Sequence, residues 1–363
     1  MIMPRVGLVL LNLVLVAWTF PSIAETYYVR PDGDDQAEGK SPQTAFKTLL
    51  RAAHVLNHGD AVLLAPGTYH DEVLLAERFS ADGAEMQITG DESGQRTAAP
   101  PGPVVIRAEN STGTALEIQR FRNLRISGLT FRGPGQGLKV QRSSGVVVQR
   151  CSFEGLSRGL ALGQCQDVRV ESSVFSRCTL GVFCQSAVRT RLAHLTVSGA
   201  SSAGILVLSS GEGAIRNSLL TGNNTNLIAD EISGPAWTSD HNVLEGSTGP
   251  WGGVPVIAKV YEWASASGQD RHSVYVMPAF QDPDSYDLHP AATVTWAGGL
   301  PGARVGQVLD PKVELDRDGR PLTVREGAVC AGAYDYPAEP QPGAGWRRLE
   351  VNLRGQGPRQ SAA

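Results

Sequence analysis

The chain has 363 residues, including 41 glycines, and a formal net charge of −4 at pH 7. This length allows one large domain or two of ordinary size, and the glycine content favours tight turns and short strands over helices. Nucleic acid is not indicated as a partner, because proteins that bind it usually carry a clear excess of basic residues.

The first 24 residues have the features of a signal peptide. Arg5 precedes an apolar run of 13 residues, and the small residues Ser22 and Ala24 come just before Glu25. A membrane helix needs about 20 apolar residues, so this run is too short to span comfortably. We therefore expect cleavage before Glu25, export to the periplasm or the medium, and no transmembrane segment in the mature protein. An uncleaved anchor is the alternative.

An N-terminal module is expected to cap the domain with a helix. Ser41 with Pro42 is a typical helix start, and Gly59 is a typical stop. The apolar stripe of this helix is predicted to comprise Phe46, Leu49, Leu50, Ala53 and Leu56. Such a cap would cover strand edges that are otherwise open to other chains.

The middle of the chain repeats a pattern every 22 or 23 residues. The repeats are 115–136, 137–158, 159–180, 181–203 and 204–226. A fixed period of this length is typical of a solenoid. Leucine-rich repeats have a similar period, but their regular leucine ladder and asparagine are not present in these segments.

Each repeat contains three short patches in which apolar residues alternate with other residues. The first patches align Leu116, Leu138, Leu160, Val182 and Ile205; the second align Ile126, Val148, Val170, Leu192 and Ile215; the third align Phe131, Phe153, Phe175 and Val197. Alternation with a period of two predicts strands with one buried face. Three strands per coil, stacked about 4.8 Å apart, make an all-β, single-stranded parallel β-helix with about 22 residues per coil.

The repeat also predicts the domain limits. We expect one β-helix domain over 25–336, with regular coils over 104–246 and an irregular part over 247–336. The segment 337–363 is rich in Pro, Gly and Arg and is expected to be a disordered tail.

The five cysteines are predicted to be free and buried rather than bridged. They are Cys151, Cys165, Cys178, Cys184 and Cys330. A disulfide needs Cα atoms within about 7 Å, and no two of the four in the coils share a column of the repeat.

Both ends of the domain resemble the right-handed parallel β-helix proteins of the pectin-lyase-like superfamily, in the form found in exported bacterial proteins. The stretches that carry the resemblance are "TYYVRPDGDDQAEGKSPQTAFKTLLRAAHVLNHGDAVLLAPGTY", "WASASGQDRHSVYVMPAFQDPDSYDLHP" and "DRDGRPLTVREGAVCAGAYDY". The resemblance implies the fold and a polysaccharide-active class that includes lyases, epimerases and hydrolases. It also implies a site along the outer face of one stacked sheet.

No cofactor or metal site is predicted. The outward residues of the first strands include one acidic residue, Glu117, whereas Ca²⁺ takes six or more oxygen ligands. Calcium remains an open alternative without a visible ligand cluster. The Asp-Pro-His-Glu run of mannuronan epimerases is also missing, since "DPDSYDLHP" retains only Asp282, Pro283 and a displaced His289.

An arginine column is predicted on the outward face of the second strands. Arg125, Arg169 and Arg191 occupy equivalent positions in their repeats. Guanidinium groups at successive rungs suit the carboxylates of an acidic polymer. The alternative is a solvated face on which the arginines pair with neighbours such as Glu171.

Catalytic residues are predicted in two places. His194 follows Arg191 closely, and a positive neighbour lowers the pKa of a histidine toward the value of a general base. Asp270 and His272 could share proton transfer in the irregular part. The alternatives are that His194 bonds a turn carbonyl and that Asp270 fixes a turn.

Trp251 and Trp263 complete the predicted site, because indole faces stack on sugar rings. Together these features predict an exported monomer that acts on a polysaccharide, expected to be acidic, as a lyase, epimerase or hydrolase. The alternative is a non-catalytic carbohydrate-binding or cell-envelope structural protein.

Overall fold

A computed structural model describes residues 24–57, 59–70, 72–78, 84–275, 278, 280–290, 306–309, 312–324 and 328–335. The predicted signal peptide, except for Ala24, and the predicted tail 337–363 lie outside the described residues.

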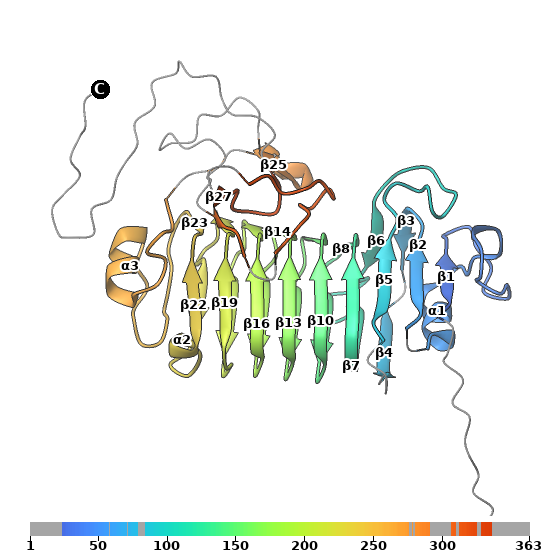
Figure 1. Ribbon diagram of the computed structural model, residues 1–363, viewed down its shortest axis with the longest axis horizontal. Coiled ribbons are helices and arrows are strands. Elements are labelled where there is room, and N and C mark those ends of the chain that lie inside the picture. The colour runs from blue at the N-terminus through green and yellow to red at the C-terminus, as the bar shows by residue number, and fades with distance from the viewer. Residues whose placement is uncertain are drawn as a thin grey trace, which may run out of the picture.

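The chain winds into a right-handed parallel β-helix in which each regular coil contributes a strand to each of three sheets (Figure 1). The first sheet contains β4 (Val73–Arg78), the first half of β7 (Thr114–Ser127), β9 (Gln136–Gln141), β12 (Arg158–Gly163), β15 (Leu180–Gln185), β18 (Ala203–Leu208) and β21 (Leu227–Ala229). The second sheet contains β1 (Thr26–Val29), β2 (Ala61–Leu64), β5 (Met86–Gly90), the second half of β7, β10 (Ser144–Gln149), β13 (Gln166–Glu171), β16 (Val188–Ala193), β19 (Gly213–Arg216) and β22 (Trp237–Asp240). The third sheet contains β3 (Gly67–Tyr69), β6 (Val104–Arg107), β8 (Thr130–Arg132), β11 (Ser152–Glu154), β14 (Val174–Ser176), β17 (Thr196–Ser198), β20 (Leu219–Thr221) and β23 (Val243–Leu244).

The remaining elements lie at the ends of the solenoid or beside it. They are η1 (Pro42–Thr44), α1 (Leu49–Val55), α2 (Ser233–Ala236), α3 (Val260–Ser267), β24 (Phe280–Asp282), η2 (Pro283–Ser285), β25 (Asp287–Pro290), β26 (Gly306–Gln307) and β27 (Ala328–Val329).

The strand registers confirm the predicted columns. In the first sheet, Leu160 pairs with Leu138 on one side and with Val182 on the other. In the third sheet, the ring of Phe153 stacks between two others, with centroid distances of 5.0 Å to Phe131 and 4.5 Å to Phe175. The parallel stacking also begins earlier than the sequence period does, at β1 and β2.

The bends between the second and third strands share an uncommon backbone conformation. In successive coils the bend residue has a positive φ: Arg150 (52°), Ser172 (46°), His194 (53°), Asn217 (51°) and His241 (59°). We call these residues the corner column. The left-handed backbone conformation turns the chain sharply between the two strands. The position of these side chains is therefore set by the bend that closes the coil.

The N-terminal cap differs from the helix predicted for it. Ser41 caps the short η1, and the α-helix proper starts later, with Thr48 as its N-cap. The prediction that Leu50 belongs to the buried stripe is wrong, because 45% of this residue is exposed. The helix buries Leu49 and Ala52 beside the first strands, at one end of the solenoid (Figure 1).

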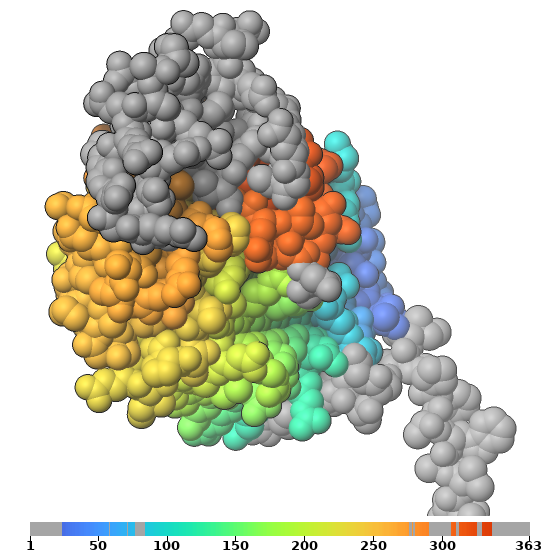
Figure 2. Space-filling view, turned by 60° about the vertical axis from the view of Figure 1, so that its left-hand side comes forward, coloured from blue at the N-terminus to red at the C-terminus, as the bar shows by residue number. Residues whose placement is uncertain are grey.

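A C-terminal segment folds back along the corner column. We call this segment the strap; it comprises 306–309, 312–324 and 328–335. Ser172 Oγ donates to the carbonyl of Leu315 at 2.6 Å, and the amide of Ala333 donates to Thr196 Oγ1 at 2.9 Å. Figure 2 shows the strap as an orange-red ridge above the yellow-green coils. The bends of several coils are therefore covered by residues more than a hundred positions away in sequence.

All five cysteines are free and buried, which confirms the prediction made from their columns. Cys151, Cys165 and Cys178 direct their thiols at backbone carbonyls of the coil. They serve as small core residues.

Candidate functional site

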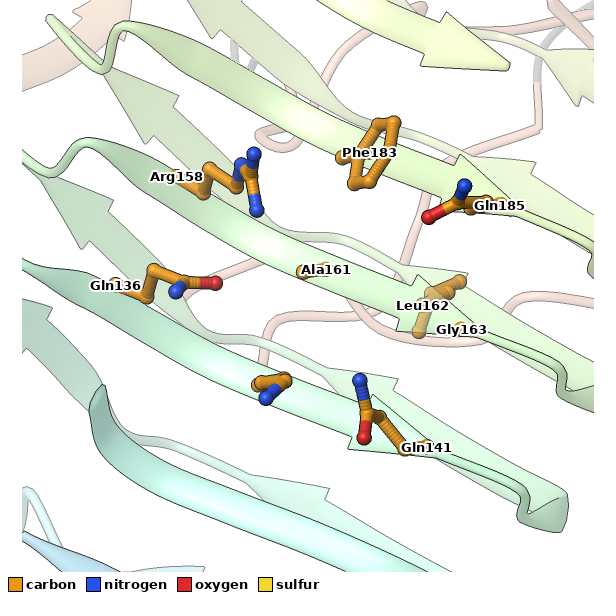
Figure 3. Close-up of a pocket in the computed structure, with 9 residues that line it drawn as sticks. Gln136, Gln141, Arg158, Ala161, Leu162, Gly163, Phe183 and Gln185 are labelled. Atoms are coloured by element: carbon orange, nitrogen blue, oxygen red, sulfur yellow. The ribbon is translucent and has the colours of Figure 1, made fainter. Parts of the chain in front are cut away.

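A shallow groove crosses the outer face of the first sheet, over β9, β12 and β15 (Figure 3). Its volume is about 240 Å³. The lining residues are Gln136, Lys139, Gln141, Arg158, Ala161, Leu162, Gly163, Phe183 and Gln185.

The depth of the groove follows from the small residues on its middle strand. Ala161 and Gly163 lie between the rung of Lys139 and Gln141 and the rung of Phe183 and Gln185. Strands stack about 4.8 Å apart, so the two flanking rungs are roughly 10 Å apart. A hollow with an aromatic ring on one side and amide groups on both sides results (Figure 3).

Two cations give the groove its charge. The guanidinium carbon of Arg158 lies 5.0 Å from the centroid of the Phe183 ring, which fixes both side chains by a cation–π contact. Within the described part of the chain, no ion pair joins Arg158 to a carboxylate. Lys139 Nζ lies 3.0 Å from Glu117 Oε1, so this second cation is partly neutralised.

A second hollow of about 240 Å³ continues the groove at the carboxyl ends of the same strands. It is lined by Gln141, Gly163, Gln164, Gln185 and Ser186. Three of these residues also line the first hollow, so the two form one strip. An open strip lined by amides, a ring and cations suits a segment of an extended chain better than an enclosed small molecule.

The predicted arginine column lies together in the structure, but two of its arginines lie close to carboxylates. Arg169 pairs in register with Arg191, and a cavity of about 300 Å³ lies between the column and the strap. Arg125, however, donates to both carboxylate oxygens of Glu85, at 2.8 and 2.9 Å. Arg169 lies 3.9 Å from Glu171, the neighbour expected in the alternative interpretation.

His194 lies beneath the strap and is 2% exposed. Asn217 Nδ2 lies 3.0 Å from its Nε2 and 2.8 Å from the carbonyl oxygen of Gln307. This amide therefore donates one proton to each partner, and the imidazole Nε2 must accept. Burial first, and the charge of Arg191 second, lower the pKa of His194 to about 4. A substrate cannot reach this histidine, so the position does not fit the predicted catalytic role.

We expect His194 to make stability depend on pH. Its pKa is about 4 in the folded protein and about 6.5 unfolded, so only the unfolded chain binds the proton between these values. Stability should therefore fall as the pH drops from about 6.5 to 4, by roughly 3 kcal/mol. Urea unfolding at several pH values measures this change. In His194→Asn the left-handed corner is kept and the titration is lost, so its curve should be flatter. Parallel curves for the two proteins would contradict the assignment.

Asp270 is also buried, within the loop that follows α3. Its Oδ2 accepts from the indole N–H of Trp263 at 3.0 Å. Its Oδ1 accepts from Ser239 Oγ, Asn242 Nδ2 and Ser273 Oγ, at 2.9, 2.9 and 2.7 Å. A carboxylate with this many donors fixes the loop, as the alternative interpretation of the sequence expected, and does not face a substrate.

The two tryptophans expected to stack on a sugar are core residues. Trp263 is 0% exposed and Trp251 is 3% exposed. Their rings pack edge to face, with centroids 6.2 Å apart. Trp251 donates its indole N–H to the carbonyl of Gly234 at 3.0 Å. Neither ring offers a face to a ligand.

His272 is exposed, and its Nδ1 lies 2.7 Å from Asp240 Oδ2. It lies beside β22, whereas His194 lies under the strap beside β19. The predicted catalytic residues thus occupy separate environments.

The lining of the groove was not predicted as a site. The outward column holding Lys139, Ala161 and Phe183 was visible in the repeat, but it lacks a catalytic motif. The usable signal was the pair of small residues, Ala161 and Gly163, next to an outward aromatic ring one rung away.

Comparisons with known proteins match the repeats. A family model described as "Right handed beta helix region" matches residues 104–245. The uncharacterized protein YwoF of Bacillus subtilis (strain 168) is 32% identical over 105 residues. That match covers 29% of this chain and 21% of YwoF, so the similarity spans about a fifth of that relative's length.

Solved structures with similar architecture include two carbohydrate-active proteins. The lacto-N-biosidase of family GH136 from Eubacterium ramulus is 12% identical with a TM-score of 0.47, over 61% of this chain and 51% of that chain. Pectate lyase Pel9A is 16% identical with a TM-score of 0.44, over 91% of this chain and 94% of that chain.

No helix among the described residues is long and apolar enough to cross a membrane. The repeat period and the three stacked parallel sheets show that the fold is a parallel β-helix. Over residues 104–245 the chain matches the right-handed β-helix family model, and its stacked parallel sheets have that fold.

Proposed function

We propose that this protein binds an acidic polysaccharide in the groove over β9, β12 and β15. The observation that carries the proposal is the hollow between the rungs of Lys139 and Phe183, with Ala161 and Gly163 as its floor. The apolar face of a sugar ring packs against an aromatic ring, and the glutamine amides supply donors and acceptors for its hydroxyl groups.

The acidic character of the ligand follows from Arg158. This guanidinium lines the groove, and its own contact is the face of Phe183. A uronate carboxylate would give it a bidentate, charge-assisted partner. Among the described residues that line the groove, none is acidic, and the carboxylate beside it, Glu117, is paired with Lys139.

A panel of polysaccharides tests the proposal. Purified residues 25–363 are run in affinity gels containing alginate, polygalacturonate, glycosaminoglycans or neutral glucans. We expect retardation by at least one acidic polymer and weaker retardation by the neutral ones. Equal mobility in every gel would contradict the proposal.

Phe183→Ala should weaken binding about tenfold, which corresponds to about 1.4 kcal/mol. The ring supplies the stacking surface and also positions Arg158. Calorimetric titration with the polymer found in the panel measures the loss. Tyr261→Ala is the matched control, because Tyr261 is an exposed aromatic residue on α3, far from the groove in sequence, and is 46% exposed. An equal loss in both variants would show that the groove is not the binding site.

A lyase is the second candidate, because two cations line one groove. β-Elimination from a uronate needs a cation at the carboxylate and a base at the neighbouring carbon. Arg158 suits the first role. Glu117 would remove the proton as the base, and Lys139, 3.0 Å away, would give a proton to the departing glycosidic oxygen. Incubation with the same panel, with and without calcium, should then produce ultraviolet absorbance from unsaturated ends, and Lys139→Ala should abolish it. New reducing ends without absorbance would instead indicate hydrolysis.

Export is proposed from the sequence of residues 1–24. We expect the mature protein outside the cytoplasm with Glu25 as its first residue. N-terminal sequencing of protein recovered from the periplasm and the medium checks this, and an intact Met1 would contradict it.

A further inference from the structure

A group of three metal-binding side chains lies at the last full coil of the solenoid. Asp240 ends β22, His241 is the last residue of the corner column, and His272 lies in the loop after α3. Their ligand atoms all lie within 4.8 Å of one another. They belong neither to the groove nor to the strap.

The backbone holds the carboxylate in a defined orientation. Asp240 Oδ1 accepts the amide protons of His241 and His272, at 2.9 and 2.8 Å. The other oxygen, Oδ2, is directed at the imidazoles, 2.7 Å from His272 Nδ1 and 3.9 Å from His241 Nε2. The two rings are stacked with centroids 4.9 Å apart and an angle of 13° between their planes.

These separations are close to those of a coordination sphere. Zinc binds histidine nitrogen and carboxylate oxygen at about 2.0 Å in a tetrahedron, which places ligand atoms about 3.3 Å apart. The two separations from Asp240 Oδ2, 2.7 and 3.9 Å, lie on either side of that value, and all three ligand atoms lie within 4.8 Å of one another. To bind an ion, the side chains would rotate toward one common point. The His272 side chain is 66% exposed, which leaves the fourth position open to solvent.

The charged side chains around the three ligands are also compatible with a bound cation. Asp240 brings one carboxylate to the group, and its Oδ2 lies near both imidazoles. Arg216 on β19 is the register partner of Asp240, and its positive charge would disfavour a bound cation. Its guanidinium, however, donates to the carbonyl of Ile215 and to Thr238 Oγ1, at 3.0 and 2.9 Å.

We propose that Asp240, His241 and His272 bind one divalent transition-metal ion, with Zn²⁺ as the ion that fits this ligand set best. Two imidazole nitrogens and one carboxylate oxygen suit zinc better than calcium or magnesium, which prefer oxygen ligands. On binding, the hydrogen bond between His272 Nδ1 and Asp240 is replaced by two bonds to the metal. The Nδ1 proton leaves to solvent, and the neutral imidazole then carries its proton at Nε2. The ion joins the loop after α3 to β22.

Titration of the chelator-treated protein with ZnCl₂ tests this proposal. Calorimetry should show one site per chain, and zinc should raise the melting temperature. His272→Ala should weaken binding by at least about tenfold, since even the loss of a residue that only supports a ligand costs that much. The melting temperature of this variant should no longer respond to zinc.

His70→Ala is the matched control. His70 is a similarly exposed histidine with one carboxylate partner, Glu109, at 2.6 Å. It lacks a third ligand in the described part of the chain, so this variant should bind zinc as the unaltered protein does. Absence of a one-site isotherm in the unaltered protein would overturn the proposal. Equal binding by the unaltered protein and His272→Ala would overturn it as well.

Discussion

Phe153→Ala is expected to reduce the free energy of unfolding by about 3 to 5 kcal/mol. Phe153 is completely buried, and its ring lies nearly parallel to those of Phe131 and Phe175, at angles of 7° and 3°. Removing the middle ring leaves a cavity in the solenoid and breaks both stacking contacts. Since the core of each coil packs on the coils above and below it, the cavity in a central coil weakens its packing on both sides. Urea unfolding followed by circular dichroism measures the change.

Phe183→Ala is the control for this stability effect. Phe183→Ala removes an outward, half-buried ring two coils further along the solenoid, and we expect it to cost less than about 1 kcal/mol. A loss below about 1 kcal/mol for Phe153→Ala as well would contradict the stacked core.

Glu92→Ala is expected to cost about 3 to 5 kcal/mol, because it leaves a buried cation without its partner. The Arg317 side chain, in the strap, is 8% exposed, whereas that of Glu92 is 37% exposed. Arg317 donates to both carboxylate oxygens of Glu92, at 3.0 and 2.9 Å, and to Ser152 Oγ at 3.0 Å. Loss of the carboxylate therefore weakens the attachment of the strap to the coils.

Removing the cation instead of the carboxylate should reduce the free energy of unfolding by less. Arg317→Leu removes the buried charge, and the more exposed Glu92 is then solvated. The double variant, Glu92→Ala with Arg317→Leu, should be more stable than Glu92→Ala alone. Urea unfolding, with limited proteolysis of the strap as a second readout, tests this order. Equal losses in the two single variants would contradict it.

The fold could be predicted because each coil needs inward apolar residues at the same positions as the coil before it. Val148 and Val170, for example, are register partners on β10 and β13, so both side chains point into the core. The helix of the N-terminal module was harder to predict, since it has no repeat to define its inward side. Phe46 is buried ahead of that helix rather than on it, and Leu50 faces solvent.

The candidate site was less predictable because burial in the irregular part depends on contacts distant in sequence. His194 lies in a regular coil, but it is buried against Cys330 and Gly332 of the strap. Asp270 and Trp263 looked like polar and aromatic surface residues, yet they bond each other inside the domain. The groove depends on side-chain size along a column, which a search for catalytic motifs does not detect.

The most direct test of binding in the groove measures how much each of the two positive surfaces contributes to the affinity for the polymer. The groove is altered by Arg158→Ala with Phe183→Ala, and the arginine column by Arg169→Ala with Arg191→Ala. Calorimetric titration of both double variants and the unaltered protein gives three affinities. We predict a loss of more than about tenfold for the groove variant, or 1.4 kcal/mol, and a smaller loss for the column variant. Unchanged affinity in the groove variant, with loss in the column variant, would contradict binding in the groove and place the polymer beside the strap.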